Sequence, residues 1–274
     1  MKTKKWLAYP YLIWMIAFIV IPLLLIIYYG FTNKAGTFTL ENITLIGDPI
    51  FKNSLLLSLK LSIISTLICL ILAYPLALIL RNMNLKSSSF VVLIFILPMW
   101  MNSLLRTLAW QNILENTGIL NRLLTFFHLP TISVINTPTA ILIGMVYNFL
   151  PFMILPIYNS LIKIDDDIIN GAKDLGANNF QVFTRIIWPL SFPGVVSGIT
   201  MVFVPSLTTF VISDILGGSK VLLIGNVIEQ QFKILNNWNT GSGLSLVLMI
   251  FIIITMAVLA KYDNNENKSG GRVL

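Results

Sequence analysis

Several polar and aromatic residues lie inside or beside long apolar stretches of this chain, where such residues are uncommon unless they have a function. They are Trp100, Trp110, Glu115, Tyr147, Asn148 and Asp214. Carboxylates attract a cation and aromatic rings offer it their electron-rich faces, so this set is a candidate path for a positively charged solute. For the tryptophans there is an alternative interpretation, because tryptophan also anchors helices at the membrane–water interface.

Patterns that support catalysis, nucleotide binding or metal binding are missing from the sequence. A phosphate-binding loop needs G-x4-G-K-[ST], and the nearest stretch, Gly217-Gly218-Ser219-Lys220, lacks that spacing. The single histidine, His128, and the single cysteine, Cys69, form no metal-ligand cluster. Three consecutive aspartates at 165–167 are more typical of a helix start than of a metal site. We therefore expect no catalytic residue, metal or cofactor in this chain.

The composition of the chain indicates an integral membrane protein. Of the 274 residues, 56% are hydrophobic and 11% are charged, and the mean hydropathy is +0.85. Soluble domains carry about 25% charged residues and could not hide this much apolar surface. A soluble enzyme, a nucleic-acid-binding protein and a disordered regulator are therefore excluded. The net charge of +7 is attributed to Lys and Arg at the cytoplasmic membrane flank rather than to nucleic-acid binding.

Six stretches are long and apolar enough, or nearly so, to cross a bilayer core, which needs about 20 residues per helix. They are residues 7–31, 55–80, 90–105, 140–162, 195–213 and 244–260. The third is the weakest, because Asn102 and Ser103 interrupt it. Apolar runs without alternation exclude a membrane β-barrel. We predict an all-α integral membrane protein with six transmembrane helices in a single domain over 1–274.

The distribution of Lys and Arg predicts that both termini are cytoplasmic. With the amino terminus inside, the inner segments are 1–6, 81–89, 163–194 and 261–274, and they hold eleven of these cations. The longer outer segments hold six. This bias follows the rule that positive charge accumulates on the cytoplasmic side of the membrane. The predicted location is the plasma membrane of a prokaryotic cell.

Prolines interrupt the predicted spans and indicate a kinked bundle around a polar path. They are Pro22, Pro75, Pro98, Pro151, Pro156 and Pro205. Each removes a backbone hydrogen bond, which a membrane helix tolerates where a neighbour or a wet cavity satisfies the freed carbonyl. Because prolines are common in membrane helices, the more specific signal is the pair at 151 and 156 close to Tyr147 and Asn148. Gly194 and Gly198 would let another helix approach closely.

The inner segment 163–190 is predicted to contain two short helices rather than a linker. Asp165 suits the amino-terminal cap of the first helix. Ile168, Ala172 and Leu175 follow at helical spacing as one apolar stripe. Gly176 ends this helix with a left-handed carboxy-terminal cap.

The second helix of this segment is predicted to begin at Asn178, with Gln181 completing a capping box, and to end at Trp188-Pro189. The small residues Gly171 and Ala172 on the first helix leave little to bury in lipid. Binding in a groove of another protein is therefore favoured over lipid contact.

The spacing of this segment resembles the EAA loop of ABC importer permeases, E-A-A-x3-G-x9-I-x-L-P. The matching positions are Asn170-Gly171-Ala172, Gly176, Ile186 and Trp188-Pro189, with Asn170 in place of Glu, Gly171 in place of Ala and Trp188 in place of Leu. The resemblance implies that 163–190 is the loop that couples the permease to an ATPase. Its expected coupling residues are Asp165, Asn170, Gly171, Ala172, Gly176, Ile186 and Pro189.

Three further stretches look like the first of the two permease subunits of spermidine/putrescine importers. They are Leu97-Pro98-Met99-Trp100 with the following 103–107, Asn148-Phe149-Leu150-Pro151-Phe152, and residues 213–220. Thr208-Thr209 stands where many members of that family carry Gly and an acid. The resemblance implies a type I ABC importer fold that moves polyamines.

The same resemblance implies a set of partners. They are a second permease subunit, most simply as a heterodimer, a dimer of ATP-binding subunits that holds ATP and Mg²⁺, and an extracytoplasmic substrate-binding protein. Other interpretations remain: the same architecture importing iron, sulfate or thiamine, a stand-alone secondary transporter, or a membrane enzyme. A secondary transporter would need inverted repeats or acids at the membrane midplane, which we do not find.

Overall fold

Helices make up almost the whole described part of the chain, as a backbone that crosses lipid must hydrogen-bond to itself. The structure is a computed structural model, and it describes residues 9–83 and 97–269. Within these residues the only β pairing is an isolated bridge between Thr32 and Phe38. The predicted all-α class is confirmed.

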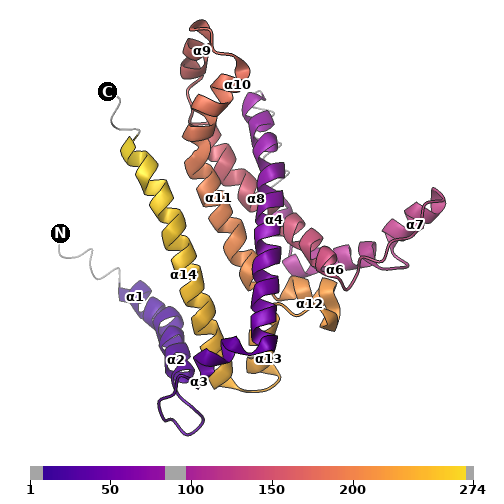
Figure 1. The fold of residues 1–274 in the computed structure, drawn as a ribbon, viewed down its shortest axis with the longest axis vertical. Coiled ribbons are helices and arrows are strands. Elements are labelled where there is room, and N and C mark those ends of the chain that lie inside the picture. The colour runs from indigo at the N-terminus through magenta and orange to yellow at the C-terminus, as the bar shows by residue number, and fades with distance from the viewer. Residues whose placement is uncertain (1–8, 84–96, 270–274) are drawn as a thin grey trace.

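The long helices form the body of the molecule, and shorter ones connect them (Figure 1). The long ones are α4 (Pro49–Asn82), α8 (Pro138–Leu161), α11 (Trp188–Thr208) and α14 (Trp238–Ser269). The first apolar segment is α1 (Tyr9–Met15), a π-helical turn (Ile16–Val20) and α2 (Ile21–Gly30). The others are α3 (Glu41–Thr44), α6 (Ser103–Leu114), α7 (Ile119–Phe126), α9 (Asp166–Asp174), α10 (Asn179–Val182), α12 (Val211–Gly217) and α13 (Ile224–Lys233).

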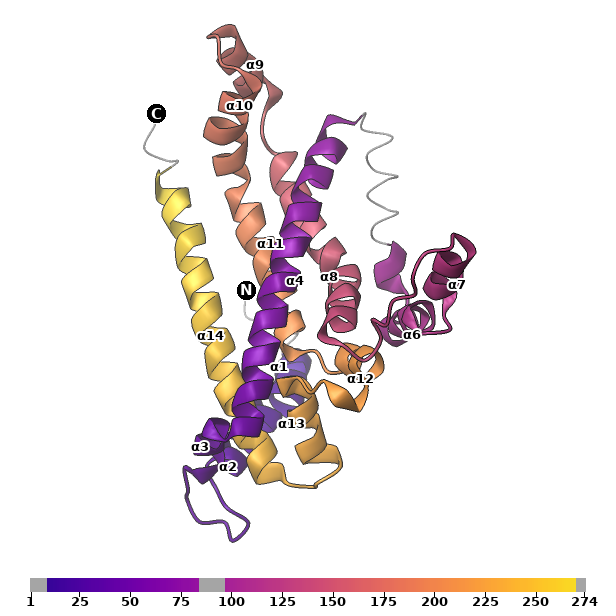
Figure 2. The same ribbon diagram turned by 45° about the vertical axis from the view of Figure 1, so that its right-hand side comes forward.

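A bundle of α4, α8 and α11 holds the main buried core, which includes Cys69, Met153, Ile157 and Val202. Helix α14 leans away from this bundle and packs against α2 near the end that carries α3 and α13 (Figure 2). Helices α9 and α10 lie at the opposite end, toward which α14 also runs (Figure 1). This arrangement agrees with the predicted placement of the carboxyl terminus on the same side of the membrane as 163–190.

Five described helices are long and apolar enough to span a membrane: Tyr9–Gly30, Pro49–Asn82, Pro138–Leu161, Asn179–Thr208 and Trp238–Leu259. Each overlaps one of the predicted spans. Residues 90–96 of the remaining predicted span, 90–105, lie outside the described residues.

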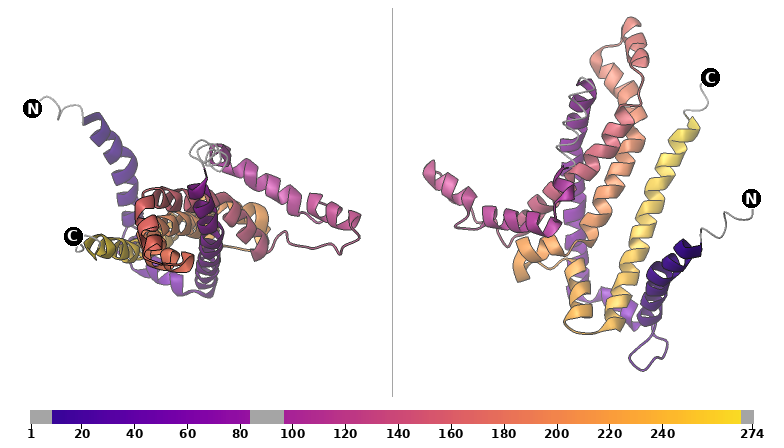
Figure 3. Two further views of the ribbon diagram at one scale, coloured as in Figure 1. Left: turned by 90° about the horizontal axis from the view of Figure 1, so that it is seen from above. Right: turned by 180° about the vertical axis from the view of Figure 1, so that it is seen from behind.

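The described end of the predicted span 90–105 differs from the expectation. Residues 97–100 are helical, but the helix stops at Met101, and Asn102 caps the separate helix α6 by accepting a hydrogen bond from the Leu104 amide at 2.8 Å. Helices α6 and α7 then project sideways from the bundle as an arm (Figure 3). The polar cap residue, which weakened the prediction, is the cause of this break.

The predicted span 195–213 was wrong at its outer end, because α11 stops at Thr208 and α12 begins at Val211. The Phe210 carbonyl accepts hydrogen bonds from the Asp214 amide and Ser213 Oγ, both at 2.9 Å, and from Asn226 Nδ2 at 3.1 Å. Helix α13 also packs its Gly225 against the carbonyls of Thr208 and Thr209. The break is therefore stabilised by a helix distant in sequence, which a local pattern does not reveal.

The expected helix end at Trp188-Pro189 was also wrong. The helix continues from Asn179 through a π-helical turn at Phe183–Ile187 into α11, so Pro189 lies in the first turn of α11. Pro189 has no N–H to donate to the Arg185 carbonyl four residues earlier, and the π-helical turn around Arg185 departs from this i→i−4 pattern, so the proline is accommodated without ending the helix.

Close approach between α8 and α11 depends on two glycines of α11. A Cβ atom added at Gly194 would lie 2.6 Å from the Pro156 carbonyl oxygen, and one added at Gly198 would lie 2.7 Å from the sulfur of Met153. The predicted close approach of another helix at these glycines is confirmed, and its partner is α8.

Substituting Gly194 should loosen this packing. We expect Gly194→Ala to lower the free energy of unfolding by about 1–3 kcal/mol, because the methyl group meets backbone that cannot move away. Thermal unfolding in detergent measures the change. Gly47→Ala is the matched control, since an added Cβ there meets no atom within 4 Å. Equal melting temperatures for the two variants would contradict the close contact.

Candidate functional site

The first candidate site is the cytosolic loop 163–190, whose first helix has the caps that the sequence predicts. The Asp165 carboxylate accepts a hydrogen bond from the Asp167 amide at 3.1 Å and begins α9. At the other end, Gly176 has a φ of +85°, a conformation that strongly favours glycine. The amides of Gly176 and Ala177 bond to the carbonyls of Lys173 and Ala172 at 2.9 and 3.0 Å, which is a Schellman cap.

The second helix of the loop also begins as predicted. Asn178 Oδ1 accepts from the Gln181 amide at 2.8 Å, and Gln181 Oε1 accepts from the Asn178 amide at 2.9 Å. Because this helix runs without interruption into α11, a displacement of the loop is transmitted directly to a membrane-spanning helix.

The apolar residues of the loop divide between an inner and an outer face. Ile169 and Val182 are buried in the core cluster shared with α4, α8 and α11. Ile168, Leu175 and Phe180 are exposed, and Leu175 has 91% of its surface accessible. Of the predicted stripe, only Ala172 packs against the bundle, next to the buried Ile169, whereas Ile168 and Leu175 face away from it. The loop therefore presents an apolar tip.

The guanidinium of Arg81, in the last turn of α4, ties the loop to the bundle. It donates from Nε to the Leu161 carbonyl and from Nη2 to the Ile164 carbonyl, both at 2.9 Å. Nη2 also lies 2.8 Å from the Asp166 carboxylate. The Arg81 side chain is only 9% exposed, so water competes little for the two carbonyl bonds, whereas Asp166 is largely solvated. One side chain thus joins the ends of α4 and α8 to the start of α9.

The structure places the predicted coupling residues on one solvent-accessible loop, although their role remains a prediction. Asn170, Gly171, Gly176 and Pro189 are exposed, whereas Ala172 and Ile186 are partly buried. An added Cβ at Gly171 would meet no atom within 4 Å, so this helix face is open to a partner.

The second candidate site is the solute path, and the structure brings only part of its predicted set together. The rings of Trp110 and Tyr147 pack edge to face at 5.3 Å between centroids. Asn148 is buried and donates from Nδ2 to the Gly144 carbonyl at 2.9 Å. Trp100 is highly exposed, and Glu115 is the carboxy-terminal cap of α6. Of the six predicted residues, only Asn148 lines either of the two cavities that border the break between α11 and α12.

One of these cavities, of about 300 Å³, lies where α6 and α8 meet the break. Its walls include Arg106 and Thr107 of α6, Asn148 and Phe152 of α8, and Thr209 of the break. The polar residues of this wall come from α6, α8 and the break between α11 and α12. Polar side chains that face a cavity are the environment expected at membrane depth for a polar path.

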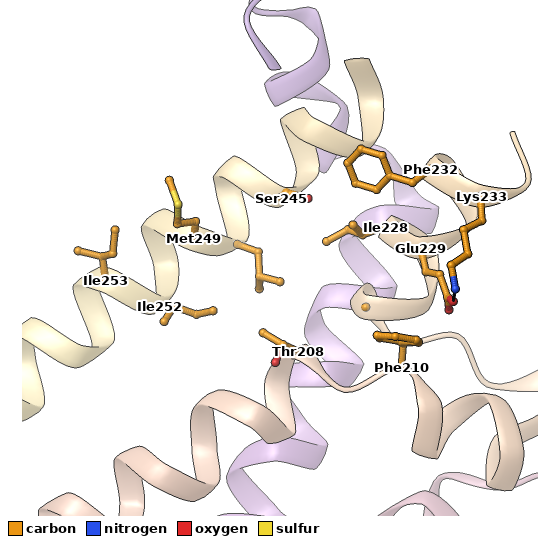
Figure 4. A pocket seen from close by; sticks show the side chains of 12 residues that line it. Thr208, Phe210, Ile228, Glu229, Phe232, Lys233, Ser245, Met249, Ile252 and Ile253 are labelled. Carbon is orange, nitrogen blue, oxygen red and sulfur yellow. Dashed lines mark hydrogen bonds and ion pairs between the residues drawn. The ribbon is translucent and has the colours of Figure 1, made fainter. Parts of the chain in front are cut away.

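The other cavity, of about 500 Å³, lies between the end of α11, α13 and α14 (Figure 4). Its α14 wall is apolar, with Met249, Ile252 and Ile253. On the opposite side Glu229 and Lys233 form an ion pair at 2.6 Å, and the Lys233 ammonium lies 5.9 Å from the centre of the Phe210 ring.

Asp214 lies beside this ion pair, outside the spanning helices. It accepts a hydrogen bond from Asn226 Nδ2. Partial burial raises the pKa of the Asp214 carboxyl above its usual value, and the neighbouring Glu229 carboxylate raises it further. Asp214 and Glu229 therefore form an acidic cluster, in which Asn226 donates to Asp214 and the charge on Asp214 depends on pH.

Sequence reasoning did not select Arg106, Asn226, Phe210 or Lys233 as site residues. Arg106 follows an apolar stretch and was assigned to an outer segment, although the structure buries it. The i,i+4 spacing of Glu229 and Lys233 could have indicated their pairing. Nothing local predicts that Asn226 reaches the carbonyl of Phe210 and the carboxylate of Asp214.

Comparison with known proteins decides the family. Residues 71–262 match the family described as "Binding-protein-dependent transport system inner membrane component". The chain belongs to this family. The permease is also 38% identical over 263 residues to the "Spermidine/putrescine transport system permease protein PotB" of Haemophilus influenzae, covering 93% of this chain and 92% of that one. The protein of the same name from Escherichia coli is 37% identical, over 93% and 96% of the two chains.

Solved structures support the same fold. A chain of a bacterial ABC transporter involved in the import of the acidic polysaccharide alginate aligns with a TM-score of 0.76 at 17% identity, over 96% of both chains. A chain of the MetNI methionine ABC transporter aligns with a TM-score of 0.58 at 16% identity, over 78% of this chain and 95% of that one. The predicted ABC importer permease fold is confirmed, and the permease is an inner-membrane component.

Removing the Arg81 side chain should free the loop of the permease from the bundle. For Arg81→Gln we expect faster hydrogen exchange of the α9 amides and a loss of local stability of about 1.5–3 kcal/mol, since two buried carbonyls lose a charged donor. Exchange measured by mass spectrometry on the purified permease tests this. Arg185→Gln, at an exposed site within the loop, is the control. Unchanged α9 exchange in Arg81→Gln would show that the loop is held by packing alone.

Proposed function

We propose that this chain is a permease subunit of an ATP-driven importer of polyamines such as spermidine and putrescine. The observation that carries the proposal is the 37–38% identity to spermidine/putrescine permeases across 93% of the chain. The acidic cluster at Asp214 and the packed rings of Trp110 and Tyr147 support a cationic solute, because carboxylates and aromatic faces both stabilise ammonium groups.

The energy for transport comes from partners in this proposal. A dimer of ATP-binding subunits holds ATP and Mg²⁺. It binds the apolar tip of loop 163–190, around Leu175 and Phe180. A second permease subunit completes the path, and an extracytoplasmic binding protein delivers the solute. The exposed tip and the continuous helix from 179 to 208 support this assignment, because closure of the ATPases would tilt α11 directly.

The reconstituted complex tests the function. Permease pair, ATPase and binding protein are placed in vesicles with ATP inside, and uptake of labelled spermidine and putrescine is measured. We expect uptake that needs both ATP and the binding protein. Absence of ATP-dependent uptake of both polyamines, with uptake of another solute by the same vesicles, would contradict the substrate assignment while leaving the fold intact.

A charge placed on the apolar tip should uncouple the importer. We expect Leu175→Glu to lower uptake and transport-stimulated ATP hydrolysis at least about tenfold, because a carboxylate cannot be buried unpaired in the ATPase groove. Membrane insertion should not change, since Leu175 is 91% exposed. Phe38→Glu, which introduces the same carboxylate in place of an exposed apolar residue of the outer hairpin, is the control. Normal uptake by Leu175→Glu would contradict docking at the tip.

External pH should control uptake through Asp214. Its raised pKa means that the carboxyl is protonated, and loses its attraction for cations, at a higher pH than an ordinary aspartate near 3.9. Uptake should therefore fall as external pH decreases through this raised pKa. Asp214→Asn should lower uptake at neutral pH and remove this dependence. An identical pH profile in wild type and Asp214→Asn would show that another group titrates.

A further inference from the structure

Arg106 is a buried cation that has no counter-charge in the described chain. Its residue is only 7% exposed, and neither Nε nor Nη1 has a hydrogen-bond partner among the described residues. An uncompensated charge at such a site is strongly destabilising, and a guanidinium does not lose its proton to escape the penalty. The site is therefore complete only when an anion reaches it.

The cavity of about 300 Å³ beside α6 is the place where such an anion can bind. Arg106 lines it together with Ser103 and Thr107. Asn148, on the facing helix α8, has a buried Oδ1 that is also unpaired, so unsatisfied polar groups converge on this cavity from two helices. A water molecule held beside the anion would donate to the Asn148 oxygen.

The carboxylates described in this part of the chain are engaged elsewhere. Asp214 accepts from Asn226, although α12 itself lines the cavity through Val211 and Ile212. Glu229 is paired with Lys233 one turn along the same helix, α13. Glu115 caps the far end of α6, nine residues after Arg106.

The surroundings of the cavity are those of a protein interface. The first turn of α6, which borders the cavity, exposes Leu104 and Leu105, and Met101 before it is also exposed. On α8, Tyr147 beside the buried Asn148 is 38% exposed. Exposed apolar residues in a membrane protein face lipid or another chain, and because lipid tails offer no anion to Arg106, another chain is favoured here.

We propose that Arg106 binds a side-chain carboxylate of the second permease subunit, inserted into this cavity. This inference rests on the proposed function, because a bare guanidinium on the route would repel a polyamine, whereas a neutral Arg–carboxylate pair would not. A guanidinium and a carboxylate form two parallel hydrogen bonds, so the pair would also fix the register of the two permeases.

Carbodiimide cross-linking of the assembled importer tests the proposal. In Arg106→Lys the new amine lies near the same carboxylate. A membrane-permeant carbodiimide adds to that carboxylate to form an O-acylisourea. The amine then attacks the acyl carbon, forming an amide and releasing the reagent as a urea that carries one of the carboxylate oxygens. We expect a covalent permease pair whose linked peptide contains position 106. Arg122→Lys, on the exposed part of α7, is the control and should give no such peptide.

A second variant keeps the test decisive if Arg106→Lys assembles poorly. Arg106→Gln should weaken association of the two permeases roughly 30-fold or more, as expected when one member of a buried charged pair is truncated. Neutralising the partner carboxylate identified by cross-linking should produce little further loss in the Arg106→Gln background.

The possible outcomes separate the source of the anion from the transport function. No linked peptide at position 106, together with unchanged association of Arg106→Gln, would overturn the proposal. Stabilisation of the wild-type complex by added formate, absent in Arg106→Gln and without cross-linking, would assign the cavity to a free anion and overturn the partner source. Uptake of spermidine by the wild-type complex is measured in parallel, so a failure of the substrate assignment is seen independently of the cross-link.

Discussion

The hydrogen bonds of Arg81 to the carbonyls of Leu161 and Ile164 connect loop 163–190 to the membrane bundle, and the proposed transmission of force from the ATPases depends on this connection. A loop that only packed against the bundle could slide, because apolar contacts have no preferred direction. The buried guanidinium fixes the end of α8 and the start of α9 relative to α4. With Ile169 seated in the core, the loop and three helices can move as one body.

At the opposite end of the molecule, a side chain again hydrogen-bonds to a backbone carbonyl of another segment. Helix α11 stops at Thr208, the Phe210 carbonyl accepts a hydrogen bond from Asn226 Nδ2, and Gly225 of α13 packs closely against the carbonyls of Thr208 and Thr209. Both cavities border this break, because Thr208 and Phe210 line each of them. A continuous helix here would bury its polar groups within its own ladder and offer none to a solute.

Much of this architecture could be predicted from local sequence. The caps at Asp165, Gly176 and Asn178 depend on residues within one turn, and all three were predicted correctly. The all-α membrane class follows from composition alone. The end of the helix at Met101 and the continuation through Pro189 were not predicted, because a capping side chain and a π-helical turn decide them within otherwise apolar runs. Arg81 bonds to a segment far from it in the chain, and Arg106 is buried without a partner for Nε or Nη1 among the described residues. Counting charges along the sequence cannot distinguish such residues from Lys and Arg at the surface.

The most direct test of the account is the distance between the loop and its own bundle during the ATP cycle. Spin labels are placed at two exposed positions, Ile79→Cys on α4 and Leu175→Cys on the loop, with buried Cys69 replaced by Ser. The distance distribution is measured by pulsed electron resonance in an importer that retains uptake, at rest and trapped with ATP. Rigid attachment predicts one unchanged distribution in both states. A shift of the distance on ATP trapping would show that the loop moves separately from α4, and would contradict the account.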